Sequence, residues 1–140
     1  MGQVTVLIPW GGSCEHRQDA LEWTVDRYRA ERPGWDVRVS EVAGPWCKAD
    51  AIVHGLDGAR EIVVVADGDS WCDGTVAAVA AVEEGAPWAV PHRLVHRLTP
   101  AATVRALAGK TPLDRLECRP RPYRGTAGGG IVVARRDTLL

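Results

Sequence analysis

Apolar residues follow one another in short runs that alternate with stretches of helical spacing. Three runs are continuous and rich in β-branched residues, which predicts buried strands at residues 4–8, 62–66 and 131–134. Residues 37–42 alternate between apolar and polar positions, and 87–90 form a short apolar run. The pattern therefore predicts five strands, the third of which is covered on both faces.

Between these runs, apolar residues recur at the three- and four-residue spacing of amphipathic helices. The predicted helices span about 17–31, 49–56, 75–84 and 99–108. Ser13 and Asp73 are expected to cap the first and third helices, and Thr99 followed by proline begins the fourth. Residues 110–124 contain three prolines among basic side chains and are expected to form an extended loop.

The alternation of strands and helices predicts an α/β fold, with a mainly parallel sheet and helices on both faces. Ligands of such sheets bind beyond the carboxyl ends of the strands. Pro9 and Trp10 follow the first strand, residues 41–45 follow the second, and Asp67-Gly68-Asp69 follows the third. We expect these three loops to meet at one edge of the sheet.

A length of 140 residues suits a single domain over 1–140. The formal net charge of −1 gives no support for nucleic acid or an anionic membrane as partner. No apolar run is long enough to span a membrane, no leader precedes the first strand, and the four cysteines form no Cys-x-x-Cys pair. We therefore expect a cytoplasmic protein. The sequence leaves open a homo-oligomer and a separate C-terminal chain.

Asp67-Gly68-Asp69 carries the sharpest chemical signal. Two carboxylates one residue apart, directly after a buried strand, suit one Mg²⁺ or Mn²⁺ ion, which prefers oxygen ligands and takes the remainder from substrate phosphates. Gly68 lets the backbone turn tightly between them. Asp and Gly are also common in capped turns, so the same motif is compatible with a purely structural role.

Four stretches in order resemble the GT-A glycosyltransferases of the family 2 type. Residues 44–52 are similar to the Lys-Ala-x-Ala helix of that family, and 61–69 are similar to its hydrophobic strand ending in Asp-x-Asp. Residues 4–9 resemble its first strand, and 128–137 resemble the segment before its acceptor region. The resemblance implies a Rossmann-like GT-A nucleotide-binding sheet.

The resemblance also implies a nucleoside-diphosphate sugar donor, a hydroxyl acceptor and Mn²⁺ or Mg²⁺ as cofactor. It places the metal on Asp67 and Asp69. It assigns the nucleotide-sugar contacts to five positions: Pro9, Trp10, Glu41, Lys48 and Asp67. Glu41 falls near the acidic residue that family members place beside the base or ribose, although the paired Asp that is usual after the second strand is absent.

Family members carry their catalytic base in a Trp-Gly-x-Glu-Asp-like stretch after the Gly-Gly segment. This sequence ends at Leu140 before such a stretch, so the domain is expected to be truncated at its C-terminus and its catalytic residue is unknown. A non-catalytic binding or assembly module is the alternative. A nucleotidyltransferase would show a basic Gly-rich loop after the first strand, which 11–15 match poorly.

Several other side chains have two interpretations. Trp46 and Trp71 flank the expected site and suit either stacking on a sugar or base, or packing. Arg17 suits the same pocket or the solvent. The basic cluster at 92–97 suits a solvated loop, or a metal ligand or acceptor contact. Residues 119–124 suit a lid over the donor phosphates or a basic loop.

Overall fold

The computed structural model describes residues 3–12, 14–124 and 130–140. The chain divides into two compact units, Met1–Pro91 with Gly130–Leu140, and His92–Gly129, each described here by itself. Ser13, predicted to cap a helix, and Gly128 and Gly129, predicted to lead into a strand, lie outside the described residues.

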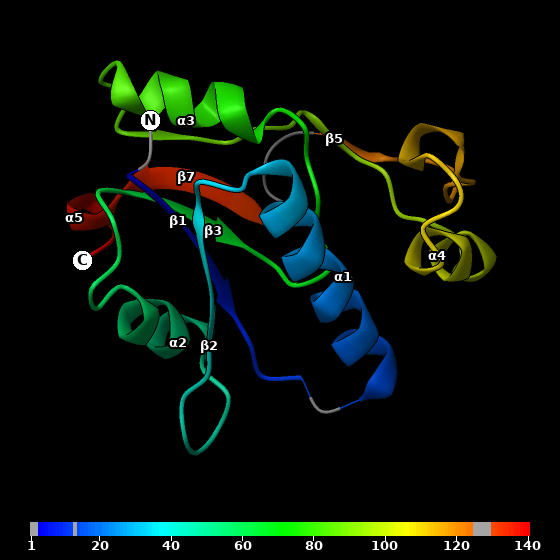
Figure 1. Ribbon diagram of the computed structural model, residues 1–140, viewed down its shortest axis with the longest axis horizontal. Helices are drawn as coiled ribbons and strands as arrows, with labels where there is room; N and C mark the ends of the chain where they lie inside the picture. Colours follow the sequence, from blue (N-terminus) through cyan, green and yellow to red (C-terminus); the bar gives the residue numbers. More distant parts are fainter. Residues whose placement is uncertain (1–2, 13, 125–129) are drawn as a thin grey trace. The chain divides into compact units, whose positions relative to one another are not determined.

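The first unit is built on a five-stranded sheet in the order β2-β1-β3-β7-β4 (Figure 1). The strands have these bounds: β1 Val4–Pro9, β2 Asp36–Ser40, β3 Ile62–Ala66, β4 Trp88–Ala89 and β7 Ile131–Arg135. Strand β1 pairs in parallel with both β2 and β3. Strand β7 is antiparallel to β3 and to β4.

The sheet is therefore mixed, and the expectation of a mainly parallel sheet holds only for β2, β1 and β3. The chain enters β7 at the edge where β3 ends, since Ile131 is paired with Ala66. Strand β7 must consequently run back along β3 in the opposite direction. The coarser prediction of an α/β fold is confirmed.

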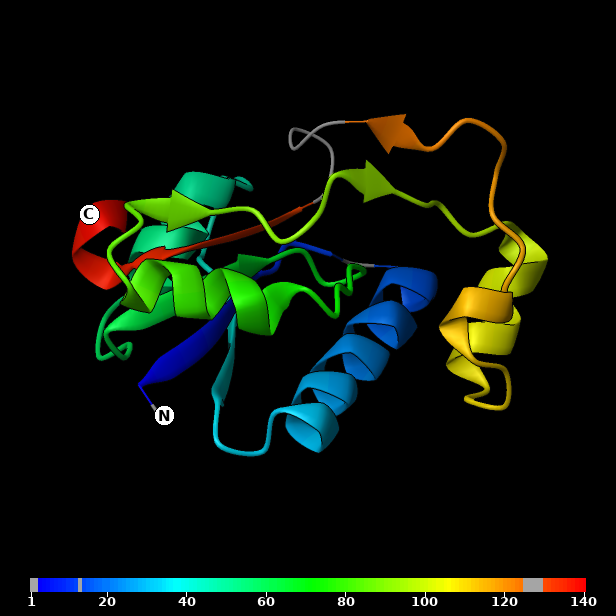
Figure 2. The same cartoon turned by 90° about the horizontal axis from the view of Figure 1, so that it is seen from above.

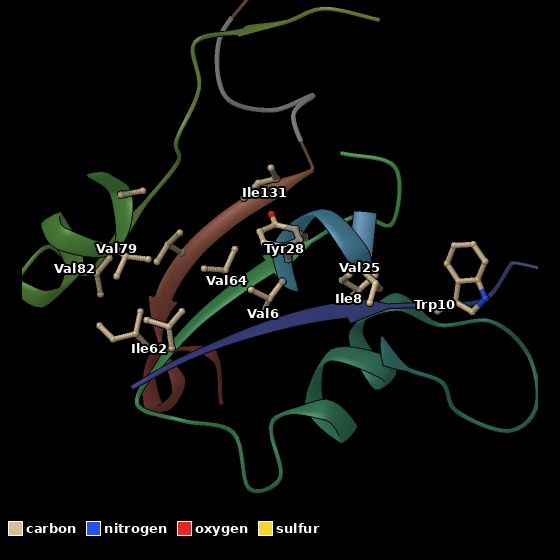
Figure 3. Close-up of a cluster of buried hydrophobic side chains, with 14 of the residues drawn as sticks. Val6, Ile8, Trp10, Val25, Tyr28, Ile62, Val64, Val79, Val82 and Ile131 are labelled. Carbon is tan, nitrogen blue, oxygen red and sulfur yellow. The ribbon is translucent and has the colours of Figure 1, made fainter. Parts of the chain in front are cut away.

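Helices cover both faces of the sheet, as predicted. They are α1 Glu15–Glu31, α2 Lys48–Gly55, α3 Thr75–Glu83 and the short α5 Arg136–Leu139. Val6 and Ile8 of β1 pack in one cluster with α1 and α3 (Figure 3). Leu7 packs in a second cluster, together with Ile52 of α2. Because side chains alternate along a strand, β1 and β3 are buried on both faces, which explains their continuous apolar sequences.

The predicted helix cap at Asp73 is wrong. Gly74 is the N-cap residue of α3 and makes no side-chain cap hydrogen bond. The Asp73 carboxylate instead accepts a hydrogen bond of 2.9 Å from Trp71 Nε1. A local side-chain contact has replaced the capping interaction, although the helix begins at Thr75 as the sequence predicts.

The second unit is small. It contains β5 Leu94–Val95, α4 Pro100–Leu107, the 3₁₀ turn η1 Leu113–Arg115 and β6 Tyr123–Arg124. Thr99 caps α4 by accepting a hydrogen bond from the Ala102 N–H (3.2 Å), as its Thr-Pro start predicts. Strands β5 and β6 pair antiparallel (yellow-green and orange in Figure 2), so 110–124 are not one continuous loop.

Within the described part of the chain, no helix combines the length and apolar character needed to cross a membrane.

Candidate functional site

The strand order reverses between β1 and β3. From β1 the chain continues to β2 on one side, and then crosses to β3 on the other side of β1. In doubly wound sheets such a reversal leaves a crevice at the carboxyl ends of the two strands, where ligands bind. Pro9 is the last residue of β1, and Asp67 directly follows β3. Two of the predicted site segments thus leave the sheet at this position.

Lys48 and Asp67 are joined directly at this edge. Lys48 Nζ lies 2.7 Å from Asp67 Oδ1, and the two side chains are 50% and 41% exposed. Lys48 is the first residue of α2, so its position depends on where that helix starts. The structure therefore brings together two residues that lie 19 positions apart in the sequence and that were both predicted as donor contacts.

Backbone contacts fix the position of Asp67. Its N–H donates to the Gly130 carbonyl (2.8 Å), and its own carbonyl accepts from Ser70 Oγ (2.9 Å). Gly130 has a φ of +66°, and a β-carbon there would overlap the Asp67 carboxylate. Gly130 is therefore part of the site, which the sequence did not reveal. The only sequence signal for this role was a glycine directly before a buried strand.

Gly68 is packed tightly between α1 and β1. Its carbonyl lies 2.7 Å from Oγ1 of Thr24, a fully buried residue of α1. A β-carbon on Gly68 would lie 3.0 Å from the Trp10 ring and 3.2 Å from Leu21. A side chain at this position would push against these neighbours, so packing helps to hold the turn between the two aspartates. Thr24 is a second residue that sequence reasoning missed, although it lies on the apolar face of its helix.

Asp69 and Glu41 are both exposed. Within the described residues, neither side chain makes a hydrogen bond or an ion pair with Lys48, Asp67 or any other residue. No group of three or more His, Cys, Asp or Glu side chains in this part of the chain is arranged to hold a metal. Asp67 and Asp69 thus offer at most a pair of carboxylates, and further ligands would come from phosphates and water.

Trp10 lies beneath the site. Its side chain is almost fully buried and lies at one end of the core cluster, beyond Ile8 (Figure 3). The backbone N–H of Trp10 donates to the backbone carbonyl of Ser40, the last residue of β2 (2.8 Å). The Arg17 guanidinium lies 5.2 Å from the centroid of the Trp10 ring. Trp10 therefore forms a floor, and Arg17 adds positive charge above it.

Trp46 lies at the surface beside the same loops. Its side chain is half exposed, and its ring covers the backbone of Gly11, where a β-carbon would overlap it. Cys47 has an extended backbone (φ −139°, ψ 113°) and joins Trp46 to Lys48. The half-exposed ring is thus two residues from the ion-paired lysine.

Trp71 has a packing role. Its ring lies 4.9 Å from the Tyr28 ring, edge to face, and the guanidinium groups of Arg27 and Arg32 lie 4.9 and 5.6 Å from its centroid. These contacts tie the loop after Asp69 to α1. Burial raises the pKa of Tyr28 to about 12, with a further increase from Cys72 that Arg32 opposes.

An open hollow lies at the start of α1. It is lined by Cys14, Glu15, Gln18 and Asp19. Its two carboxylates repel an anionic ligand, so this hollow is not suited to a diphosphate.

Comparison with protein-family models and with curated proteins finds no match for this chain.

Proposed function

We propose that the first unit binds a nucleoside-diphosphate sugar through Mn²⁺ or Mg²⁺, and that the chain is the donor-binding part of a glycosyltransferase acting on a hydroxyl acceptor. The observation that carries the proposal is the exposed ion pair between Lys48 and Asp67 at the carboxyl ends of β1 and β3. A Rossmann-like GT-A arrangement of the sheet is part of the same proposal.

This ion pair is suited to an exchange of partners. An exposed pair contributes only about 0–1 kcal/mol, so separating its two charges costs little. A divalent cation bound to Asp67 would release the Lys48 ammonium, which would then donate to a phosphate oxygen. Both charges would gain a stronger partner, because a diphosphate carries more negative charge than one carboxylate.

Asp69 supplies the second carboxylate. It is exposed, and within the described residues it has no competing partner. Mg²⁺ usually takes one or two carboxylates together with substrate phosphates and waters, so a pair of aspartates meets its demand. The tight packing of Gly68 holds the turn between them in place before any ligand arrives.

Trp46 is suited to the nucleoside. With an extended backbone, its Cα lies roughly 6–7 Å from that of Lys48. One face of its ring is covered by Gly11, and half of the side chain remains exposed for a planar base. Pro9 and Trp10 form the floor beneath these groups, and exposed Glu41 is available to a ribose hydroxyl.

The metal, when bound, would neutralise the diphosphate leaving group as the bond to the sugar breaks. Lys48 would hold the same diphosphate by a charge-assisted hydrogen bond. Arg17 would add long-range attraction for the anionic donor from its position above Trp10. No described residue is assigned as the catalytic base.

Calorimetric titration with UDP, GDP, ADP and CDP, each with and without Mn²⁺, tests the proposal. We expect at least one of them to bind in a Mn²⁺-dependent manner, and Asp69→Ala to abolish that dependence. Asp57→Ala is the matched control, because the Asp57 side chain is exposed and its hydrogen bonds, to Arg38 and His54, are made by its backbone. Unchanged affinity in Asp69→Ala, or no binding of any of the four, would refute the proposal.

A donor hydrolysis assay separates the enzyme from a binding module. Release of nucleoside diphosphate from the matching nucleotide-sugar by the wild-type chain, lost in Asp69→Ala, supports a transferase. Tight Mn²⁺-dependent binding without release supports the non-catalytic alternative.

A further inference from the structure

Charge is distributed very unevenly between the two units. His92–Gly129 contains eight Lys and Arg residues against two Asp and Glu, a formal charge of +6. The remainder of the chain contains nine against sixteen, a charge of −7. The net charge of −1 thus arises because the opposite charges of the two units nearly cancel. The expectation that nucleic acid is excluded rests on this whole-chain value, so it does not apply to the second unit.

The basic residues are concentrated on a two-stranded ribbon, which we define as 92–98 and 118–124. These 14 residues include five arginines, two histidines and no Asp or Glu. Val95 pairs with Tyr123, and Leu98 is bridged to Cys118. Pro100–Leu107 and η1 lie in the connection between the two arms, where Ala102, Ala106 and Leu116 form a small core.

Two arginines face each other across the ribbon. The Arg119 N–H donates to the Arg97 carbonyl (2.7 Å), next to the bridge between Leu98 and Cys118. Both side chains are exposed. The two guanidinium groups therefore extend from neighbouring positions on the two arms.

A third arginine lies in a bulge on the second arm. One residue, His96, separates Val95 from Arg97, whereas the three residues 120–122 separate Arg119 from Tyr123 on the facing arm. The middle residue of the three is Arg121, the only non-glycine residue with a positive φ (63°) in the described chain. Such strain and such bulges are concentrated at functional sites, where they redirect a side chain.

We propose that this ribbon binds the phosphate backbone of double-stranded DNA. The major groove is about 12 Å wide and admits a two-stranded β-ribbon, whose strands are roughly 4.8 Å apart. Arginines on both arms and on the bulge would then reach phosphates on the two sides of the groove. Arginine suits this contact because its planar guanidinium makes bidentate hydrogen bonds to phosphate.

The low aromatic content of the ribbon favours a duplex over a single strand. Proteins that bind single strands without sequence preference stack successive bases on several aromatic side chains, and the ribbon contains one aromatic residue, Tyr123.

Fluorescence anisotropy of a labelled 20-base-pair duplex, titrated with the full chain over a series of salt concentrations, tests this proposal. The test variant is Arg97→Gln/Arg119→Gln/Arg121→Gln. The matched control is Arg105→Gln/Lys110→Gln/Arg115→Gln, which removes the same charge from the same unit outside the ribbon. The assay contains neither metal nor nucleotide, so its result is independent of the donor site.

We expect the wild-type chain to bind the duplex and the ribbon variant to bind about tenfold or more weakly. The slope of log affinity against log salt should fall by roughly 2–3, because about 0.9 of a counterion is released per phosphate contact. The control variant should change affinity by less than about threefold. Equal losses in both variants, or no duplex binding at low salt, would overturn the proposal. So would tighter binding to a single strand, or binding only to phosphatidylserine vesicles.

Discussion

Lys48 Nζ lies 2.7 Å from Asp67 Oδ1, so the first residue of α2 is connected to the residue that follows β3. The pair lies where the strand order reverses, and both side chains are exposed. Removing one partner of a structural ion pair lowers the free energy of unfolding, whereas removing one partner of a ligand-binding pair changes the affinity for the ligand.

Lys48→Gln should alter ligand binding while leaving stability nearly unchanged. The free energy of unfolding should fall by less than about 1 kcal/mol, since the pair is exposed. Affinity for the nucleoside diphosphate with Mn²⁺ should fall about tenfold or more, because a charge-assisted hydrogen bond is lost. Affinity for Mn²⁺ alone should rise by up to about fivefold, because Asp67 loses its competing partner. Urea unfolding and calorimetry measure the three quantities.

Lys110→Gln is the control for this experiment, because Lys110 is the only other lysine of the chain. It should leave all three quantities unchanged. A Lys48→Gln variant that binds Mn²⁺ more weakly than the wild type would contradict the exchange of partners.

Gly130→Ala should lower the free energy of unfolding by more than the positive φ of Gly130 alone explains, because the new β-carbon would displace the Asp67 carboxylate. Gly130 and Gly58 share a φ of +66°, where alanine costs about 1–2 kcal/mol. A β-carbon at Gly58 meets nothing closer than Arg38 at 3.8 Å, whereas at Gly130 it overlaps the Asp67 carboxylate. We expect Gly58→Ala to lose only that conformational stability, and Gly130→Ala to lose more, together with Mn²⁺ binding. Equal unfolding energies and intact Mn²⁺ binding in the two variants would argue against a role for Gly130.

Trp46→Ala should weaken binding of the nucleoside part of the donor only. Affinity for the nucleoside diphosphate with Mn²⁺ should fall about fivefold or more, since a stacked aromatic pair contributes about 1 kcal/mol. Affinity for inorganic pyrophosphate with Mn²⁺ should stay the same. Trp88→Ala serves as control, because Trp88 is 58% exposed on the edge strand β4. Parallel losses for the diphosphate and pyrophosphate would disprove stacking on Trp46.

Tyr28 should make stability depend on pH in the alkaline range. Burial raises its pKa to about 12, whereas the unfolded chain ionises near 10. The contribution of neutral Tyr28 to the free energy of unfolding is therefore fully present below pH 10. It is lost as pH rises towards 12, by about 2–3 kcal/mol in total. Tyr28→Phe removes this contribution. Urea unfolding at pH 8 and 11 should show the variant gaining about 1 kcal/mol relative to the wild type at the higher pH. A constant difference between the two proteins would exclude this linkage.

The sequence predicts the centre of the sheet well. The continuous apolar runs of β1 and β3 correspond to strands buried on both faces, and the helical spacing of α1 and α2 gives their positions to within a few residues. The direction of β7 was not predictable in this way, because the apolar run of four residues at 131–134 has the same pattern in parallel and antiparallel pairing.

The second unit was harder to predict for a different reason. Strands β5 and β6 have two residues each, and exposed arginines surround them. Such short pairs carry no hydrophobic period, so the prolines of 110–124 predicted only an extended loop. Their pairing depends on contacts between segments about 30 residues apart, which the local sequence does not encode.

The site, too, could be predicted from the local sequence only in part. The Asp67-Gly68-Asp69 motif and Lys48 could be selected by residue type and place, but their direct contact depends on the parallel pairing of β1 with β3. Thr24 and Gly130 contribute by packing and close approach, and neither role has a sequence signature. Asp73, which was predicted to cap a helix, instead accepts a hydrogen bond from the Trp71 side chain. Capping preferences do not take such a competing side chain into account.

The most direct test of the central claim is the anomalous scattering of Mn²⁺ in a crystal of the chain grown with the best-binding nucleoside diphosphate. We predict one strong Mn²⁺ peak within about 2.2 Å of carboxylate oxygens of Asp67 and Asp69, with the diphosphate on the same ion and Lys48 turned to a phosphate oxygen. A bound diphosphate with no Mn²⁺ peak at these aspartates, and Lys48 still paired with Asp67, would contradict the account.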